Sequence, residues 1–385
     1  MASNRARLAI ASGFATQGFV FISLTTRLPD FSDRWHLSDL ELSGLLLMMV
    51  LLAGVGSVLA ERLAERSDSA TLLRVGLGLI AIAVPVLGAA PSVAFFVAGM
   101  AVYGVGLGVV DASTNMQAVA LEHTYGRPIL PSFHGAWTLG GIVGAAVTLA
   151  TPNFPLEATA VLAVLPLVVL FGPFLRRDHG IAAEISEVAV PWRPILLVGA
   201  ALVLFYMVDT AATTWGPTYL DDTFTTPEGL VALATFPYLV ASGLVRLAGD
   251  RVVATYGAVR VLRIGAVVAA LALAVVVFAP SWPVAVVGFT LLGAGTAVIA
   301  PLSFSAAARI AGGDELDPGA RQRRVDAVIA RFNQFNYMGA LLGAVLTGVV
   351  GAGNLRIGFA VPMVLILLLL PLARAFAPVP SRVTT

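Results

Sequence analysis

The segment LAERLAERSDSATLLRVG, residues 59–76, returns in altered form as RLAGDRVVATYGAVRVLRIG, residues 246–265. At an offset of 189 residues, the acidic-basic pair Glu61-Arg62 aligns with the pair Asp250-Arg251. An apolar residue, an arginine, an apolar residue and a glycine follow in both segments at the same offset. A match of charged and apolar positions at one constant offset indicates that the chain contains two related halves.

Other matches extend this repeat along the chain and keep the same order. They pair 25–31 with 213–219, 104–106 with 293–295, and, at an offset of 199, Gly140 and Gly144 with Gly339 and Gly343. Chance similarity at one place is common, but several matches in order are not. We therefore interpret the chain as a duplication.

The composition identifies the solvent in which the two halves fold. Of 385 residues, 58% are hydrophobic and only 12% are charged, about half the charge of a soluble domain. The core of a soluble protein cannot bury so much apolar surface, which excludes a soluble enzyme, a nucleic-acid-binding protein and a disordered chain. The net charge of +1 gives no positive electrostatic field that would attract nucleic acid. The absence of cysteine excludes disulfides and thiolate chemistry.

Hydropathy divides the chain into segments that are long enough to cross a bilayer. A spanning helix needs about 20 predominantly apolar residues, and helices satisfy their own backbone polar groups in lipid. We predict an all-α membrane protein with twelve transmembrane helices. They cover 7–28, 39–60, 72–90, 92–116, 130–150, 157–175, 194–216, 228–249, 260–279, 283–305, 327–350 and 355–374.

The arginines predict how these helices are oriented. With the N-terminus inside, all but three of the 23 arginines fall in or near cytoplasmic connections, as the positive-inside rule requires. The exceptions are Arg27, Arg34 and Arg356. We therefore expect a multi-pass protein of a bacterial-type cytoplasmic (inner) membrane, with both termini cytoplasmic.

The longest polar interruption, RRDHGIAAEISEVAVPWR, occupies mid-chain. It predicts an N-terminal six-helix bundle over 1–175, a cytoplasmic linker over 176–193 and a C-terminal six-helix bundle over 194–385. Since both halves start from the same side with six helices, they form parallel repeats related by an axis along the membrane normal.

This organisation resembles the major facilitator superfamily. Gly249-Asp250-Arg251 resembles its signature after the second helix of a half, while the first copy has Glu61 and no glycine after Arg62. A closer resemblance, in GLGVVDASTNMQ (106–117) and GRPILPSFHGAWTLGGIVGA (126–145), is to the fucose-permease branch and its YbjJ-like relatives.

Fucose permeases are proton–sugar symporters, and the resemblance implies which residues would take part. Their titrating carboxylate follows a Gly-x-Gly by three residues, with an asparagine four residues later, which matches Asp111 and Asn115. Their carboxylate in the first helix is missing here, where the span offers Thr16, Gln17 and Ser23. The match therefore argues less for fucose itself than for a related small solute.

A charged side chain at the centre of the bilayer costs about 2.5–3.5 kcal/mol, so an ionisable residue inside a predicted span is a candidate for a functional role. Three ionisable groups inside spans are candidates for proton coupling: Asp111, His134 and Asp209. The imidazole of His134 titrates near neutral pH and could relay protons to Asp111. The alternatives are that both aspartates are acids near a water boundary and that His134 only forms structural hydrogen bonds.

Two repeat-related helix faces are candidates for the substrate site. At the offset of 199, His134, Trp137 and Thr138 align with Asn333, Asn336 and Tyr337, and both sets share the i, i+3, i+4 spacing of one helix face. The alternative is hydrogen bonding between helices alone. The full predicted substrate-binding set is Gln17, Asn115, Trp137, Thr138, Tyr206, Arg331, Asn333, Asn336 and Tyr337. Arg331 could instead snorkel to the interface, and we interpret Arg246 as structural.

Taken together, these features predict a secondary active transporter and not an enzyme. We expect alternating access, proton-coupled symport of a small polar or hydroxylated solute such as a sugar, and no cofactor or metal. The expected partners are the solute, protons and membrane lipid, without nucleic acid, and the chain should be a monomer. The charged pairs Glu61-Arg62 and Asp250-Arg251 are candidate gates. Proton-coupled efflux and a receptor that does not transport remain alternatives.

Overall fold

The computed structural model describes residues 2–64, 67–125, 129–175, 191–312, 328, 332 and 334–377. Every regular element in these ranges is helical, which confirms the all-α prediction. Ten helical segments among the described residues are long and apolar enough to cross a membrane, and each overlaps one predicted span. The other two predicted spans coincide with shorter apolar helices, Leu156–Leu170 and Gln334–Val350.

The first half of the chain forms seven α-helices. They are α1 (Ala2–Thr25), α2 (Leu28–Trp35), α3 (Asp39–Ala64), α4 (Ser69–Gly88), α5 (Val93–Tyr125), α6 (Leu130–Ala150) and α7 (Val164–Leu170), with the 3₁₀ helix η1 (Leu156–Ala163) before α7. The short α2 was not predicted, because it is too polar and too short to register as a span. Helix α5 continues beyond the predicted end at 116, since hydropathy detects only the apolar part of a helix that extends past the lipid.

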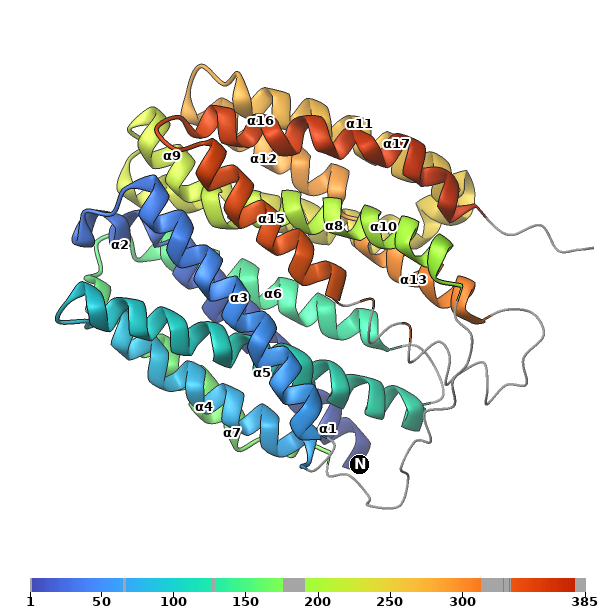
Figure 1. Ribbon diagram of the computed structural model, residues 1–385, viewed down its shortest axis with the longest axis horizontal. Helices are drawn as coiled ribbons and strands as arrows, with labels where there is room; N and C mark the ends of the chain where they lie inside the picture. Colours follow the sequence, from blue (N-terminus) through green and yellow to red (C-terminus); the bar gives the residue numbers. More distant parts are fainter. Residues whose placement is uncertain are drawn as a thin grey trace, which may run out of the picture.

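The second half repeats this order with more interruptions. It contains α8 (Trp192–Thr210), the π-helical turn η2 (Ala211–Trp215), α9 (Gly216–Phe224), η3 (Glu228–Ala234), α10 (Phe236–Tyr256), α11 (Ala258–Val277), α12 (Trp282–Thr296), α13 (Ile299–Gly312) and α15 (Gln334–Val350). The final segment is divided into α16 (Leu355–Leu365), η4 (Ile366–Leu368), α17 (Leu369–Leu372) and η5 (Ala373–Phe376). Figure 1 shows most of these helices running along the long axis of the molecule.

The repeat at an offset of 189 residues is seen in the packing of the helices as well as in the sequence. A Cβ atom on Gly104 would overlap the backbone of Met49, and one on Gly293 would overlap the backbone of Tyr238. Met49 and Tyr238 are themselves separated by this offset. Helix α5 therefore contacts α3 in the same way as α12 contacts α10.

The glycines that repeat at the offset of 199 lie where α6 packs against α1 and where α15 packs against α8. A Cβ atom on Gly140 would overlap the carbonyl of Ala15 on α1, and one on Gly339 would collide with the carbonyl of Val203 on α8. Small residues permit such close backbone approach in membrane helices. Gly140 and Gly144 on α6, like Gly339 and Gly343 on α15, thus form a stripe of small residues that permits close packing in both halves.

We expect Gly140→Val to destabilise the protein strongly, because the added side chain would force α1 and α6 apart. Overpacking costs about 1–3 kcal/mol, so the unfolding temperature in detergent should fall and the yield of monodisperse protein should drop. Gly135→Val on the same helix is the matched control, since nothing lies within 4 Å of its Cβ position. Equal effects of the two variants would contradict this interpretation of the stripe.

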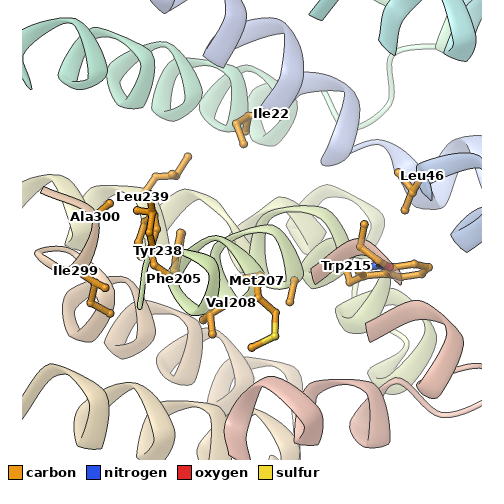
Figure 2. Packing of buried hydrophobic residues seen from close by; sticks show 14 of the residues in the cluster. Ile22, Leu46, Phe205, Met207, Val208, Trp215, Tyr238, Leu239, Ile299 and Ala300 are labelled. Carbon is orange, nitrogen blue, oxygen red and sulfur yellow. Dashed lines mark hydrogen bonds between the residues drawn. The ribbon is translucent and has the colours of Figure 1, made fainter. Parts of the chain in front are cut away.

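The two halves share one hydrophobic cluster. Helix α3 contacts α15, and α6 contacts α10 and η3. Figure 2 shows Ile22 from the first half facing Leu239 from the second, and both side chains lie beside Gly141. At the end of the bundle that holds α2 and α9, the backbone N–H of Gly353 donates to Asp39 Oδ2 at 2.7 Å. This end is therefore held together by contacts between the halves.

Candidate functional site

Asp111 lies on α5 where helices from both halves meet. Its Oδ1 accepts a hydrogen bond from Gln17 Nε2 on α1 at 3.4 Å. Its Oδ2 accepts one from the hydroxyl of Tyr337, which belongs to α15 in the other half. The carboxylate thus links the two halves through a tyrosine hydroxyl.

Two buried polar side-chain atoms on α1, at Gln17 and Thr16, lack partners within the described residues. Gln17 is only 6% exposed, and its Oε1 accepts no hydrogen bond from the described part of the chain. The same holds for the hydroxyl of the neighbouring Thr16, which is fully buried. An unpartnered buried polar atom costs about 1–3 kcal/mol. Groups of this kind are typical of a place where a solute or water completes the hydrogen bonding.

Asn115 does not contact the Asp111 carboxylate. Its Nδ2 donates instead to the backbone carbonyl of Asp111 at 2.9 Å, one turn earlier on the same helix. The side chain is half-buried and remains next to the carboxylate along α5.

A second polar link between the halves is made by Arg246 on α10. Its Nη1 donates to Thr138 Oγ1 on α6 at 3.0 Å, and its Nε donates to the carbonyl of Ala297 at 3.0 Å. Ala297 lies where α12 ends before α13 begins, so its carbonyl has lost its helical partner. Arg246 therefore stabilises this break and joins it to the opposite half.

The sequence interpretation of Arg246 as structural missed the link between the halves. A charged residue inside the apolar span at 228–249 was the available signal. Its partner could not be inferred, because Thr138 lies on the other half of the chain.

Asp209 on α8 forms a separate cluster within the second half. Its Oδ1 accepts a hydrogen bond of 2.6 Å from the hydroxyl of Tyr238 on α10, and its backbone carbonyl accepts one from Thr213 Oγ1. Tyr206 lies one turn earlier on α8 and contacts Phe205 edge to face, with ring centroids 4.9 Å apart.

His134 packs between aromatic side chains. Its ring lies 5.4 Å from that of Phe14 and 6.3 Å from that of Phe304, centroid to centroid. The hydrogen bonds described for the Asp111 carboxylate come from Gln17 and Tyr337, and a proton relay through His134 stays a prediction.

The two predicted faces lie in the region where the halves meet, as far as they are described. On α6, Trp137 contacts Phe21 with ring centroids 6.4 Å apart, and Thr138 receives Arg246. On α15, Asn336 is half-buried and Tyr337 reaches Asp111. Arg331 and Asn333 lie outside the described residues.

The candidate gating residues lie at helix ends. Glu61 and Arg62 are exposed in the last turn of α3, and Arg251 is exposed on α10. The side chain of Asp250 lies outside the described part. The two ion pairs of the described residues, Arg27–Asp30 and Arg34–Glu157, are elsewhere, so the charged clamp stays a prediction.

Known proteins match this chain along most of its length. A family model described as Major Facilitator Superfamily matches residues 197–385. An uncharacterised MFS-type transporter of Yersinia pestis is 26% identical over 90% of this chain and 89% of its own. An uncharacterised transporter of Sinorhizobium fredii is 27% identical over 78% of this chain and 81% of its own. The second half of the chain matches the major facilitator superfamily, and the likeness to an MFS-type transporter extends over 90% of the chain.

Solved structures of major facilitators share this fold. A D-xylose-proton symporter superposes with a TM-score of 0.73 over 98% of both chains, at 15% identity. The transporter FucP, in its outward conformation, gives a TM-score of 0.66 over 98% of this chain and 100% of its own, at 16% identity. The family match, the transporter relatives and the apolar helices together support a multi-pass membrane transporter and not an enzyme.

Proposed function

We propose that this transporter is a proton-coupled symporter of a small polar or hydroxylated solute, with sugars as the first class to test. The observation that carries the proposal is the Asp111 carboxylate, which accepts hydrogen bonds from Gln17 in one half and Tyr337 in the other. Asp209, bonded to Tyr238, is the second candidate for coupling.

A carboxylate at this position can couple its own protonation to a change in how the two halves are arranged. When ionised it only accepts hydrogen bonds, and it suits both Gln17 Nε2 and the Tyr337 hydroxyl. When protonated it carries a donor of its own, which leaves fewer acceptor positions and weakens the charge-assisted bonds. Protonation of Asp111 therefore loosens the link to Tyr337 and favours a different arrangement of the halves.

The surrounding side chains favour a hydroxylated solute. Trp137 and Phe21 offer aromatic surface, and Gln17 on α1 and Asn336 on α15 carry amide groups. Aromatic rings pack against the C–H faces of a sugar, and amides bond its hydroxyls. The names of two proteins with this fold, a D-xylose-proton symporter and a fucose:proton symporter, agree with that class of solute.

We further propose the topology that the arginine distribution and the repeat support. Twelve spans would form six-helix bundles over 1–175 and 194–385, joined by a cytoplasmic linker over 176–193. The monomer would lie in a bacterial-type inner membrane with both termini inside, and Glu61-Arg62 and Asp250-Arg251 would act as cytoplasmic gates.

A flux experiment distinguishes this proposal from its alternatives. Purified protein is first screened by thermal shift against sugars, nucleosides, amino acids and drug-like compounds, because a ligand of the folded state raises the unfolding temperature. The best ligand is then tested in proteoliposomes with an imposed pH gradient. Uptake with the protons supports symport, movement against the proton flow supports efflux, and binding without flux supports a receptor.

We expect Trp137→Ala to weaken binding of the stabilising solute roughly tenfold, because stacking on an aromatic ring contributes about 1–3 kcal/mol. The dissociation constant would be measured by titration of purified protein. Leu139→Ala is the matched control, since Leu139 lies on the same helix and is 61% exposed. Unchanged affinity in Trp137→Ala would remove this face from the substrate site.

A further inference from the structure

A basic pocket outside the central polar groups lies where α10 ends and α11 begins. It has a volume of about 650 Å³ and includes Arg260, Arg263 and Arg309 among its lining residues. Arg260 and Arg263 belong to the first turns of α11, and Arg309 to the last turn of α13. Phe376, in the final turn η5 of the last helical segment, closes one side. In Figure 1 this is the end of α11 near which α17 ends.

The pocket concentrates positive charge, and none of its described lining residues is acidic. Within the described residues, none of its three arginines forms an ion pair. Arg263 Nε donates to the Leu370 carbonyl at 3.3 Å, and Arg309 Nη2 donates to the Phe376 carbonyl at 3.0 Å. A guanidinium carries five N–H donors, so each arginine retains several for a ligand.

The other half of the repeat shows that the fold does not require this charge. Arg263 aligns with Arg74, whose Nε donates to the equivalent carbonyl of Leu170 at 3.2 Å, and these two arginines have a shared structural role. Arg260 and Arg309 align, at the offset of 189, with Thr71 and Ala120. Two of the three charges are therefore particular to the second half, which indicates a role beyond stability.

An apolar surface continues from the pocket along the lipid-facing side of α11. Ile264, Val267 and Leu271 are 54%, 42% and 63% exposed. Their spacing of three and four residues places them on one face of the helix. A ligand with a phosphate in the pocket could therefore lay hydrocarbon chains against this face.

We propose that the pocket binds the phosphate headgroup of an anionic membrane lipid. Arginine matches phosphate geometry with paired N–H donors, and basic pockets between transmembrane helices are known headgroup sites. The apolar face of α11 favours a lipid over free phosphate. Arg260 and Arg309 supply the specific contacts, and Arg263 adds charge while it holds α11 to the last helical segment.

Binding of phosphatidylglycerol to delipidated protein tests the proposal. The lipid is titrated into protein in neutral detergent, and bound copies are counted by native mass spectrometry, with phosphatidylcholine as the neutral comparison. We expect saturable binding of phosphatidylglycerol in preference to phosphatidylcholine. Arg260→Gln and Arg309→Gln should each weaken it roughly fivefold, as expected for one arginine near an anionic headgroup. Arg5→Gln, at an exposed position of α1, is the matched control.

Thermal unfolding without lipid shows that each variant is folded. Equal binding of the two lipids, or equal losses in Arg309→Gln and Arg5→Gln, would overturn the site. Inorganic phosphate is added as a competitor in a separate arm. If it displaced phosphatidylglycerol at similar concentrations, the pocket would be a site for free phosphate and the lipid assignment would be wrong.

Discussion

Replacing Asp111 by asparagine should abolish solute accumulation driven by a pH gradient while exchange of solute across the membrane continues. Asparagine has the size of a protonated aspartate and keeps an oxygen that accepts from Tyr337 or Gln17, but it cannot release a proton. The ratio of internal to external solute in proteoliposomes should therefore fall to about one. Counterflow of labelled solute should remain close to the wild-type rate.

Asp209→Asn provides the comparison that identifies the coupling residue. This carboxylate is also inside a span, but its described hydrogen bond is to Tyr238 within its own half. If Asp209→Asn lost accumulation and Asp111→Asn kept it, coupling would belong to α8. If Asp111→Asn still concentrated solute under a proton gradient, Asp111 would be excluded.

Replacing Arg246 by glutamine should impair both transport and stability. The change removes the bond to Thr138 and leaves the Ala297 carbonyl without its donor at the break between α12 and α13. Hydrogen bonds from charged donors contribute about 1.5–3 kcal/mol each. We expect a clear fall in unfolding temperature and a loss of transport of at least tenfold.

Thr138→Val separates the two roles of Arg246. It removes the acceptor in the opposite half with little change of shape, while the bond from Arg246 to Ala297 remains. We expect a smaller loss of stability than in Arg246→Gln, with a transport defect still present. The double variant should lose less than the sum of the single variants, because the two residues share one interaction. If the losses of the two single variants simply added in the double variant, the hydrogen bond between Arg246 and Thr138 would contribute nothing to stability.

The helices could be predicted from the sequence because lipid imposes a strict requirement on each span. Twenty apolar residues between polar connections mark a crossing almost regardless of tertiary structure. The glycine pairs were also informative, since Gly140 and Gly339 recur where two backbones must approach closely. Short polar elements such as α2 carry no such signature.

The site was only partly predictable, because its key contacts join residues that are far apart in the chain. Asp111 and Tyr337 were both candidates, yet nothing in the sequence indicated that one would bond to the other across 226 positions. The aromatic neighbours of His134, Phe14 and Phe304, could not be predicted either, because spacing gives depth in the membrane but not the direction of a side chain. Arg246 was undervalued since its partner belongs to the other half.

The most direct test of proton coupling through Asp111 is to follow external pH when solute is added to proteoliposomes without an imposed gradient. A symporter carries protons inward with the solute, so the wild-type protein should cause an immediate rise in external pH that a protonophore abolishes. Asp111→Asn should admit solute without this change. Solute entry by the wild-type protein with no change of pH, or with a fall, would contradict proton symport.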